Sequence, residues 1–464
     1  MGYNLWLKNG LVYLNRKLQE VDLIIHQGKI IQIVQHGTDS TEFDGRVEDC
    51  SGKYILPGSI DTHVHIREPG SEARETFTTG TQAAAAGGVT TVFEHPISVP
   101  PPSSAQLLRR RMEIATPQLT VDVCFFGALG ETSISRIEEM KSCGIVAFKS
   151  FLQEAMPGRE HEFEGLTICN DYELLHAMRE AARYGVPMAF HAENNDIIVK
   201  SIEALQKAGR TDPMAHYESR PVISETECIE KLLMMSRETG AKIIICHVSC
   251  PEGLELIREA KAKGISVIAE TCPHYLFTSQ EEAVQFGPMA RCNPPIRPAV
   301  SCQAMWEFVL DGTVDIVGSD HGPYTLEEKL RGKDNIFLAP AGMPGLESRV
   351  PLMVDAMLHK KMTLEKLVEL IAENPAQLFG IAHRKGFLNV GNDGDVIVVD
   401  PHEATLLDKH AMYTKGRDIA DLFHGRTLQG KICLTAVRGR VVAENGVVDQ
   451  AAVGYGEIIP AIWS

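Results

Sequence analysis

Short apolar runs rich in β-branched residues recur along the middle of the chain. The first covers residues 54–66, and seven more follow at 89–95, 121–128, 145–152, 186–192, 242–249, 266–272 and 314–320. Runs of this length and composition are typical of buried β-strands. We therefore predict eight strands, each covered on both faces.

The segments between these runs predict helices. Residues 171–184, 225–240 and 252–264 place apolar side chains at three- and four-residue spacing, and several such segments end at glycine, which helix C-caps favour. Eight strands alternating with helices over roughly 260 residues match a TIM (β/α)8 barrel, an α/β fold with its active site at the C-terminal mouth. A doubly wound open sheet is the alternative, but it would gather functional residues at one switch point.

Both ends of the chain have a different pattern of apolar and polar residues. Residues 4–56 alternate short strands with turns, and the same pattern returns at 386–391, 395–400 and 435–442. Neither end has enough apolar strand to bury a sheet alone, so we expect the two to pair into one small β-sandwich domain. The predicted division is 1–56 and 385–464 for the two halves of the sandwich, with the barrel at 57–384.

Composition narrows the possible partners. The formal net charge of the 464 residues is -16, and no basic stripe offsets it, which argues against nucleic acid. No apolar stretch reaches the ~18 residues of a membrane helix, and the N-terminus lacks a signal-peptide pattern, so we expect a cytoplasmic protein that does not bind membranes. The cysteines number eleven, an odd count, and we expect them to be reduced core thiols.

Candidate metal ligands gather at the polar ends of the predicted strands. His63 and His65 are alternate residues of one strand, so both imidazoles can face one metal ion. Such a pair alone is weak evidence, because two histidines can equally be core or surface residues. However, Lys149, His191, His247 and Asp320 lie near the C-terminal ends of four later runs. These side chains converge if the strands are parallel and closed into a barrel.

At this point the sequence resembles a known family, the cyclic amidohydrolases of the amidohydrolase superfamily. These are the allantoinases, hydantoinases, dihydropyrimidinases and dihydroorotases. The segments that carry the resemblance are 57–65, 148–149, 190–193, 246–249, 272–275, 318–321 and the tail at 385–391. Together they extend over essentially the whole chain.

The resemblance implies a binuclear metal site. His63, His65 and Asp320 would hold one metal, and His191 and His247 the other. An ammonium cannot ligate a cation, but the matching family lysine is carbamylated by carbon dioxide, which would make Lys149 an anionic bridge. Imidazole and oxygen ligands without thiolate favour Zn²⁺, with Mn²⁺, Fe²⁺ and Co²⁺ as alternatives.

The resemblance also implies a reaction and an assembly. Asp320 would be the catalytic residue, taking a proton from the attacking water and passing it to the departing amide nitrogen. The substrate would be a small cyclic amide or ureide. Family members suggest a homotetramer or homodimer.

Positions around the expected pocket bear on the substrate. Arg67 matches a dihydroorotase position, but Ile97 and Tyr275 replace two groups with which dihydroorotases hold a carboxylate, and residues 94–98 are similar to allantoinases and hydantoinases. We therefore expect allantoin or a 5-substituted hydantoin, with dihydroorotase as the alternative. The expected substrate contacts are Arg67, Ser98, Asn293 and Gly342.

Two further considerations remain open. Many D-selective hydantoinases have an oxyanion-stabilising tyrosine five residues after the bridging lysine, where this chain has Glu154, and the sequence does not show what replaces it. The other class of function is a non-catalytic scaffold, as in homologues that lost their ligands. All six ligand positions are intact here, which favours an enzyme.

Overall fold

The middle of the chain folds into an eight-stranded parallel barrel. The computed structural model describes residues 3–38, 42–155 and 158–463. Neighbouring barrel strands pair in chain order: β7 (Ser59–Val64), β8 (Val89–Glu94), β9 (Asp122–Ala128), β10 (Ala147–Phe151), β11 (Met188–His191), β12 (Ile243–Ile245), β13 (Val267–Thr271) and β14 (Ile316–Val317). The ring closes just after β14, where the His65 amide donates to the His321 carbonyl at 2.8 Å. The predicted TIM barrel is confirmed.

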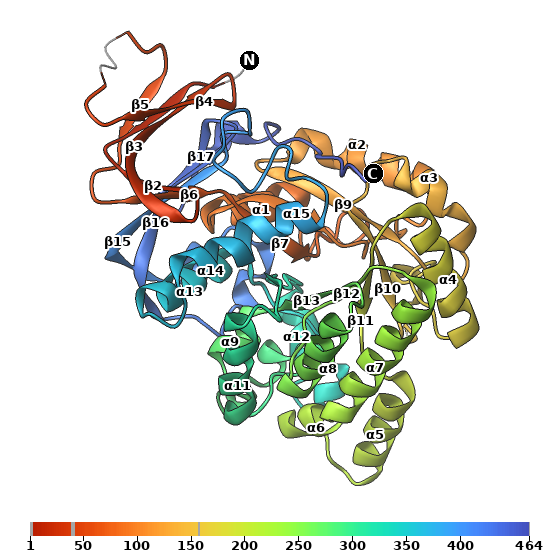
Figure 1. The fold of residues 1–464 in the computed structure, drawn as a ribbon. Coiled ribbons are helices and arrows are strands. Elements are labelled where there is room, and N and C mark those ends of the chain that lie inside the picture. Colours follow the sequence, from red (N-terminus) through yellow and green to blue (C-terminus); the bar gives the residue numbers. More distant parts are fainter. Residues whose placement is uncertain (1–2, 39–41, 156–157, 464) are drawn as a thin grey trace.

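Helices follow the strands and cover the outside of the barrel (Figure 1). They are α1 (Phe77–Ala86), α2 (Ala105–Ala115), α3 (Ile137–Lys141), α4 (Asp171–Tyr184), α5 (Asn195–Lys207), α6 (Pro213–Glu218), α7 (Val222–Thr239), α8 (Pro251–Ala262), α9 (Pro273–Phe277), α10 (Gln280–Ala283), α11 (Ala299–Leu310), α12 (Leu326–Leu330), α13 (Leu346–Leu358), α14 (Leu364–Val368) and α15 (Asn374–Leu378). As predicted, α4 and α7 end at glycines, Gly185 and Gly240, whose φ angles of 66° and 72° are left-handed.

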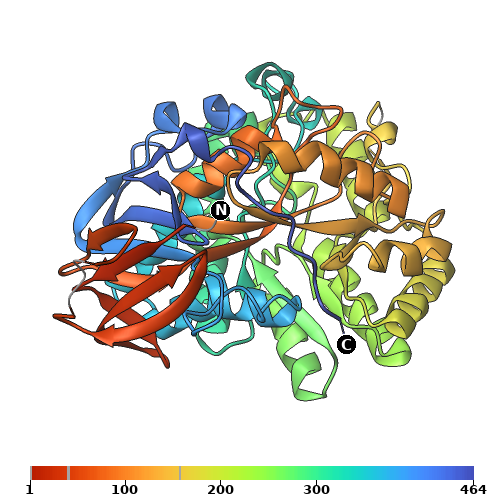
Figure 2. The same ribbon diagram turned by 90° about the horizontal axis from the view of Figure 1, so that it is seen from above.

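The two ends of the chain share one sheet. It contains β1 (Leu5–Lys8), β2 (Leu11–Leu14), β3 (Lys17–His26), β4 (Lys29–Gln35), β5 (Arg46–Asp49), β6 (Tyr54–Pro57), β15 (Val396–Leu406), β16 (Thr427–Val437), β17 (Arg440–Glu444) and β18 (Val447–Val448). The halves meet where β6 pairs antiparallel with β15. Figure 2 shows the red and blue strands side by side, away from most of the barrel helices.

A separate apolar core confirms the predicted domain from both termini. Side chains of β1, β2, β3 and β6 pack with those of β15 and β16 in one cluster, which includes Leu7, Ile55, Val398 and Leu434. The sheet is therefore bent over its own core, as in a sandwich. The boundaries at 56/57 and 384/385 stay predictions.

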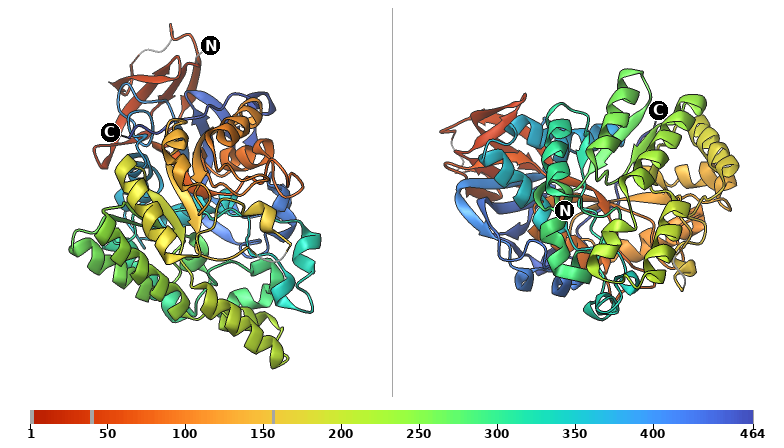
Figure 3. Two further views of the ribbon diagram at one scale, coloured as in Figure 1. Left: turned by 90° about the vertical axis from the view of Figure 1, so that its right-hand side faces the viewer. Right: turned by 90° about the horizontal axis from the view of Figure 1, so that it is seen from below.

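The C-terminal tail returns to the barrel. It runs from the terminal sheet across the barrel, and the Ile459 amide donates to the carbonyl of Val123 in β9 at 2.9 Å (Figure 2). Helices α4 to α8 lie on the side away from the red N-terminal strands (Figure 3). Among the described residues, every helix is too short or too polar to cross a bilayer.

Candidate active site

A cavity with about 810 Å³ of empty space lies at the C-terminal ends of the barrel strands. Nine of the ten residues predicted for the site line it: His63, His65, Arg67, Lys149, His191, His247, Asn293, Asp320 and Gly342. Ser98 does not; it is buried, and its hydroxyl donates to the Pro100 carbonyl at 2.9 Å. Its neighbour Ile97 lines the cavity instead.

One group of candidate ligands is formed by the first strand and the turn after the last. His63 Nε2 lies 3.4 Å and His65 Nε2 3.6 Å from the same oxygen, Asp320 Oδ1. One ligand atom from each of these three residues falls within 4.8 Å of the other two. This spacing suits three ligands of one ion.

A second group stands across the cavity. His191 ends β11, and its Nδ1 lies 3.1 Å from Nε2 of His247, which follows β12. The ring centres of His63 and His247 are 5.2 Å apart, so the two groups are neighbours. Two imidazole nitrogens that face each other at this distance can share a cation.

Lys149 lines the same cavity as both groups. Its side chain is fully buried, and Nζ is 3.1 Å from Cys246 Sγ. Burial is the main cause of the low pKa values of the four histidines and of the raised pKa of Asp320. The nearby Lys149 ammonium lowers the histidine pKa values further and opposes the rise at Asp320. A bridging group must lie near both sets of ligands.

The protonation states fit a cation. Burial lowers the pKa values of His63, His65 and His247 well below the ordinary value, so these rings are neutral and keep a lone pair. Burial also raises the pKa of Asp320 to about 8, and a cation beside this carboxylate would offset that rise. Among the described residues, His63 Nε2, the nitrogen that faces Asp320, is buried without a hydrogen-bond partner. Unpaired buried nitrogens are costly, and a metal ion would satisfy ligands of this kind.

Two candidate ligands also sit on strained backbone. His247 has φ 38° and Asp320 has φ 49°, a region that residues with a Cβ rarely adopt. Such strain is often found where a side chain must be aimed at a functional site. Here it turns both side chains inward just beyond the ends of β12 and β14.

The sequence of the whole chain also matches a known protein family. The model of the family described as "Amidohydrolase family" matches residues 54–442, which is most of the chain. The chain belongs to the amidohydrolase family.

Its relatives match over nearly their full length. An L-hydantoinase of Paenarthrobacter aurescens is 34% identical over 98% of both chains, and an allantoinase of Bacillus licheniformis is 36% identical over 99% of this chain and 100% of its own. Among solved structures, the L-hydantoinase (dihydropyrimidinase) from Arthrobacter aurescens superposes with a TM-score of 0.92 at 33% identity, covering 99% of this chain and 100% of that one. The expected resemblance is confirmed.

The sequence did not reveal Glu270, at the C-terminal part of β13 in this amidohydrolase. Its Oε1 lies 2.6 Å from His63 Nδ1 and accepts the His247 amide at 3.2 Å, while Thr62 donates to Oε2 at 2.7 Å. The carboxylate therefore fixes His63 with Nδ1 protonated and Nε2 free for a ligand. A lone glutamate at a strand end gave no signal for this role.

Glu193 has the same relation to the second group. Its Oε2 is 2.7 Å from His191 Nε2 and also receives a hydrogen bond from Arg220. Burial pushes the pKa of Glu193 up, but Arg220 and His191 outweigh it and hold the pKa below its ordinary range. Glu193 is thus an anion that turns His191 Nδ1 toward His247. Its position two residues after His191 was the only available hint.

Arg67 occupies the far end of the cavity. It is 3% exposed, and its Nη2 donates to the Tyr324 hydroxyl at 3.4 Å, while Nε and Nη1 have no partner among the described residues. Arg159 also lines the cavity, but Glu162 pairs with it at 2.5 Å. Burial opposes ionisation of Tyr324, yet Arg159, Arg67 and Arg74 together lower its pKa. This end of the cavity therefore offers hydrogen-bond donors and positive charge.

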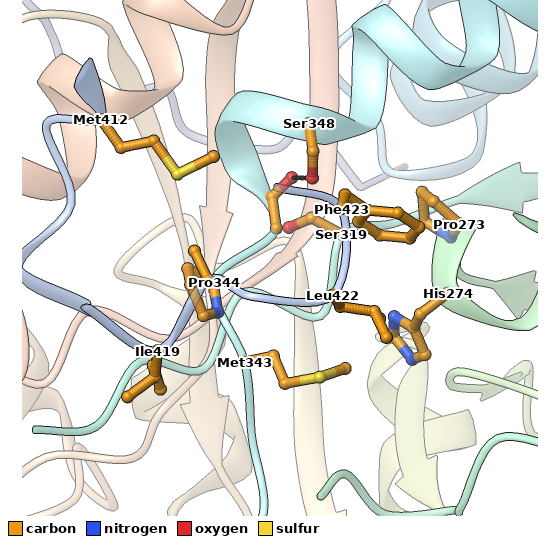
Figure 4. A pocket seen from close by; sticks show the side chains of 12 residues that line it. Pro273, His274, Ser319, Met343, Pro344, Ser348, Met412, Ile419, Leu422 and Phe423 are labelled. Carbon is orange, nitrogen blue, oxygen red and sulfur yellow. Dashed lines mark hydrogen bonds between the residues drawn. The ribbon is translucent and has the colours of Figure 1, made fainter. Parts of the chain in front are cut away.

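A second cavity, beside Ser319 and Met343, has a different character. Met412, Ile419, Leu422 and Phe423 line it together with Met343, Pro344 and His274 (Figure 4). It contains none of the candidate ligands. Its lining is mainly apolar, so the chemistry belongs to the first cavity.

Proposed function

We propose that this amidohydrolase opens the cyclic amide bond of a hydantoin-type ring, with allantoin or a 5-substituted hydantoin as substrate. The observation that carries the proposal is the convergence of all six candidate ligands in one cavity at the barrel mouth. Full-length relatives named allantoinase and L-hydantoinase support the substrate class. A scaffold without activity would have no need to retain this set.

The proposed centre takes two divalent cations. His63, His65 and Asp320 would hold one, His191 and His247 the other, and Lys149, carbamylated by carbon dioxide, would bridge them. Bound cations, with Zn²⁺ preferred and Mn²⁺, Fe²⁺ or Co²⁺ as alternatives, would polarise the substrate carbonyl and activate water. Glu270 and Glu193 keep the imidazoles oriented for this purpose.

Asp320 moves the proton in the proposed reaction. Its Oδ1 faces the centre of the cavity, beside His63 and His65. The carboxylate accepts a proton from the attacking water and returns it to the departing amide nitrogen. An amide nitrogen leaves poorly unless it is protonated, so this transfer allows the ring to open.

The remaining lining holds the ring. Asn293 Oδ1 is buried without a partner among the described residues, and it can accept a ring N–H. Gly342 has φ 142°, and a Cβ there would lie 2.4 Å from the Gly322 carbonyl oxygen, so only glycine leaves this wall open. Arg67 would bind a polar exocyclic arm.

A hydrolysis panel tests the function. Allantoin, several hydantoins, dihydrouracil and dihydroorotate are offered to one metal-replete preparation made with bicarbonate. Allantoin or a 5-substituted hydantoin should give the highest kcat/KM, and Asp320→Asn, which keeps an oxygen ligand but loses the base, should reduce turnover roughly 10²-fold or more. Absence of ring opening for every compound would contradict the proposal, and so would near-parental turnover by metal-replete Asp320→Asn.

Dihydroorotate is the second candidate, because the two unpartnered nitrogens of Arg67 could hold a carboxylate. Arg67→Met should impair hydrolysis of a substrate with a polar exocyclic arm and leave unsubstituted hydantoin nearly unaffected. The kcat/KM values for the two substrates check this. If the wild-type enzyme has a higher kcat/KM for dihydroorotate than for allantoin and every hydantoin, the second candidate is correct.

Family membership supports three further proposals. The enzyme acts on small molecules, assembles as a homotetramer or homodimer, and works in the cytoplasm. Sedimentation of the purified holoenzyme measures the assembly.

A further inference from the structure

A second cluster of metal-binding side chains lies at the surface, on the loop between β15 and β16. The loop covers residues 407–426, and two backbone hydrogen bonds close its neck: Leu407 N–H to the Arg426 carbonyl at 2.9 Å, and Gly425 N–H to the Leu407 carbonyl at 2.8 Å. These bonds bring Asp408 and His424 together across the neck. Asp408 directly follows Leu407, and His424 directly precedes Gly425.

His410 completes the cluster through a short turn. The 3₁₀ helix η7 (Lys409–Ala411) begins after Asp408, whose Oδ1 accepts the His410 amide at 3.0 Å. This cap brings the His410 ring beside His424, with ring centres 5.4 Å apart. One ligand atom from each of Asp408, His410 and His424 lies within 4.8 Å of the other two.

The charges around the cluster favour a cation. Among the described residues, no lysine or arginine pairs with Asp408, since Lys409 is bound to Asp421 at 2.5 Å. The Lys409 amide donates to His424 Nδ1 at 3.3 Å, and Asp408 Oδ1 lies 3.7 Å from the same nitrogen. This long backbone contact places the ring beside Asp408 while the site is empty, and an ion that binds Nδ1 would take its place.

We propose that Asp408, His410 and His424 form a zinc site separate from the active site, with water completing the coordination. Two imidazoles and one carboxylate are ligands that Zn²⁺ accepts, whereas Ca²⁺ and Mg²⁺ require oxygen ligands. The ion holds the neck of the loop closed, in addition to the two backbone bonds. It takes no part in the proposed hydrolysis.

The loop connects this site to the active centre. Thr414, at its middle, donates to Glu75 Oε2, and the same oxygen lies 3.1 Å from Nε2 of His321, the residue after Asp320. Met412, Ile419, Leu422 and Phe423, from the same loop, line the apolar cavity (Figure 4). Zinc at the neck therefore stiffens a segment that supports the back of the active site.

Metal stoichiometry of the holoenzyme tests the proposal. Wild-type protein, His410→Ala and Asp408→Asn are dialysed against zinc buffered at the lowest free concentration that saturates the wild type, and zinc per chain is measured by mass spectrometry. Both variants should bind one zinc fewer than the wild type. The control is His402→Ala, which removes an exposed histidine from β15 outside the cluster and should bind as many ions as the wild type.

Each other outcome contradicts the proposal. Equal stoichiometry in all four proteins means that no ion binds at the neck. Loss in His410→Ala but not in Asp408→Asn means that the carboxylate is no ligand. Hydrogen exchange supplies a second readout, because zinc should slow exchange across 408–424 in the wild type and not in His410→Ala. These measurements do not depend on hydrolysis, so they stand apart from the proposed function.

Discussion

His63 and His191 each have one ring nitrogen bonded to a buried carboxylate, and this determines which nitrogen remains for a metal. Glu270 takes Nδ1 of His63, whereas Glu193 takes Nε2 of His191. The two rings therefore use opposite nitrogens to face the same cavity. The candidate ligands could be predicted from motifs, but Glu270 could not, because β13 is distant from His63 in sequence.

Glu270→Gln should weaken metal binding roughly 10- to 100-fold, since the amide cannot hold the His63 ring as the carboxylate does. Competition with a chelator measures the dissociation constant directly. Glu225→Gln is the matched control: Glu225 is equally buried, but it pairs with Arg297 and touches no candidate ligand. If both variants released metal alike, loss of buried charge would explain the effect and the orienting role would be wrong.

Lys149→Ala should abolish binuclear metal binding, because it removes the bridge and leaves two separate sets of imidazoles. Metal content after reconstitution with bicarbonate measures the loss. Short-chain carboxylates in the medium should restore part of the activity by occupying the space of the side chain. Full metal content with normal turnover in this variant would exclude the bridge.

At the scale of elements, the sequence predicted the order of strands and helices better than their ends. Residues 171–184 form α4 as predicted. In contrast, the apolar runs 242–249 and 314–320 were expected to be strands along their whole length. Only Ile243–Ile245 and Ile316–Val317 form strands in the structure. His247 and Asp320, which follow these strands closely, have positive φ angles that a strand cannot accommodate. Apolar periodicity carries no signal for such functional strain.

Substrate-contact predictions show the same limit. Arg67, Asn293 and Gly342 line the cavity, whereas Ser98 turns away into its own loop. Similarity of a five-residue segment did not determine which of its side chains faces the cavity. That depends on loop backbone, which a motif does not specify.

At the scale of the molecule, a buried ion network joins the barrel to the terminal domain. Lys385 contacts Asp122, the first residue of β9, and lies 2.9 Å from Asp393 and 2.7 Å from Asp395. Arg438 of the terminal domain also contacts Asp122. Burial opposes ionisation of Asp393, but Lys385 and Lys29 lower its pKa to about 2.

Lys385→Met should lower the free energy of unfolding by about 3–5 kcal/mol, because it removes the ion-pair partner of buried Asp395 and weakens the pairing of Asp122 and Asp393. The stabilising charge of Asp393 is present above its unfolded pKa of about 3.9 and is lost as the pH falls toward 2. The variant should raise the pKa of Asp393, so acid unfolding should begin at higher pH. Denaturant titrations at several pH values measure both effects.

Lys29→Met is the control for this network. Lys29 pairs with the same carboxylate at 2.6 Å, but its side chain is 46% exposed, so its removal should cost less than about 1 kcal/mol. Equal losses for the two variants would show that burial does not determine the strength of the network.

The pairing of β6 with β15 has a consequence for synthesis on the ribosome. The nascent chain presents β6 long before its antiparallel partner exists, and with elongation at about 5–20 residues per second the wait is roughly 20 to 70 s. During that time the first six strands expose an unpaired edge that can join another chain. Slow elongation on crowded ribosomes therefore favours aggregation of the newly made N-terminal strands, even though β15 covers their edge in the finished protein.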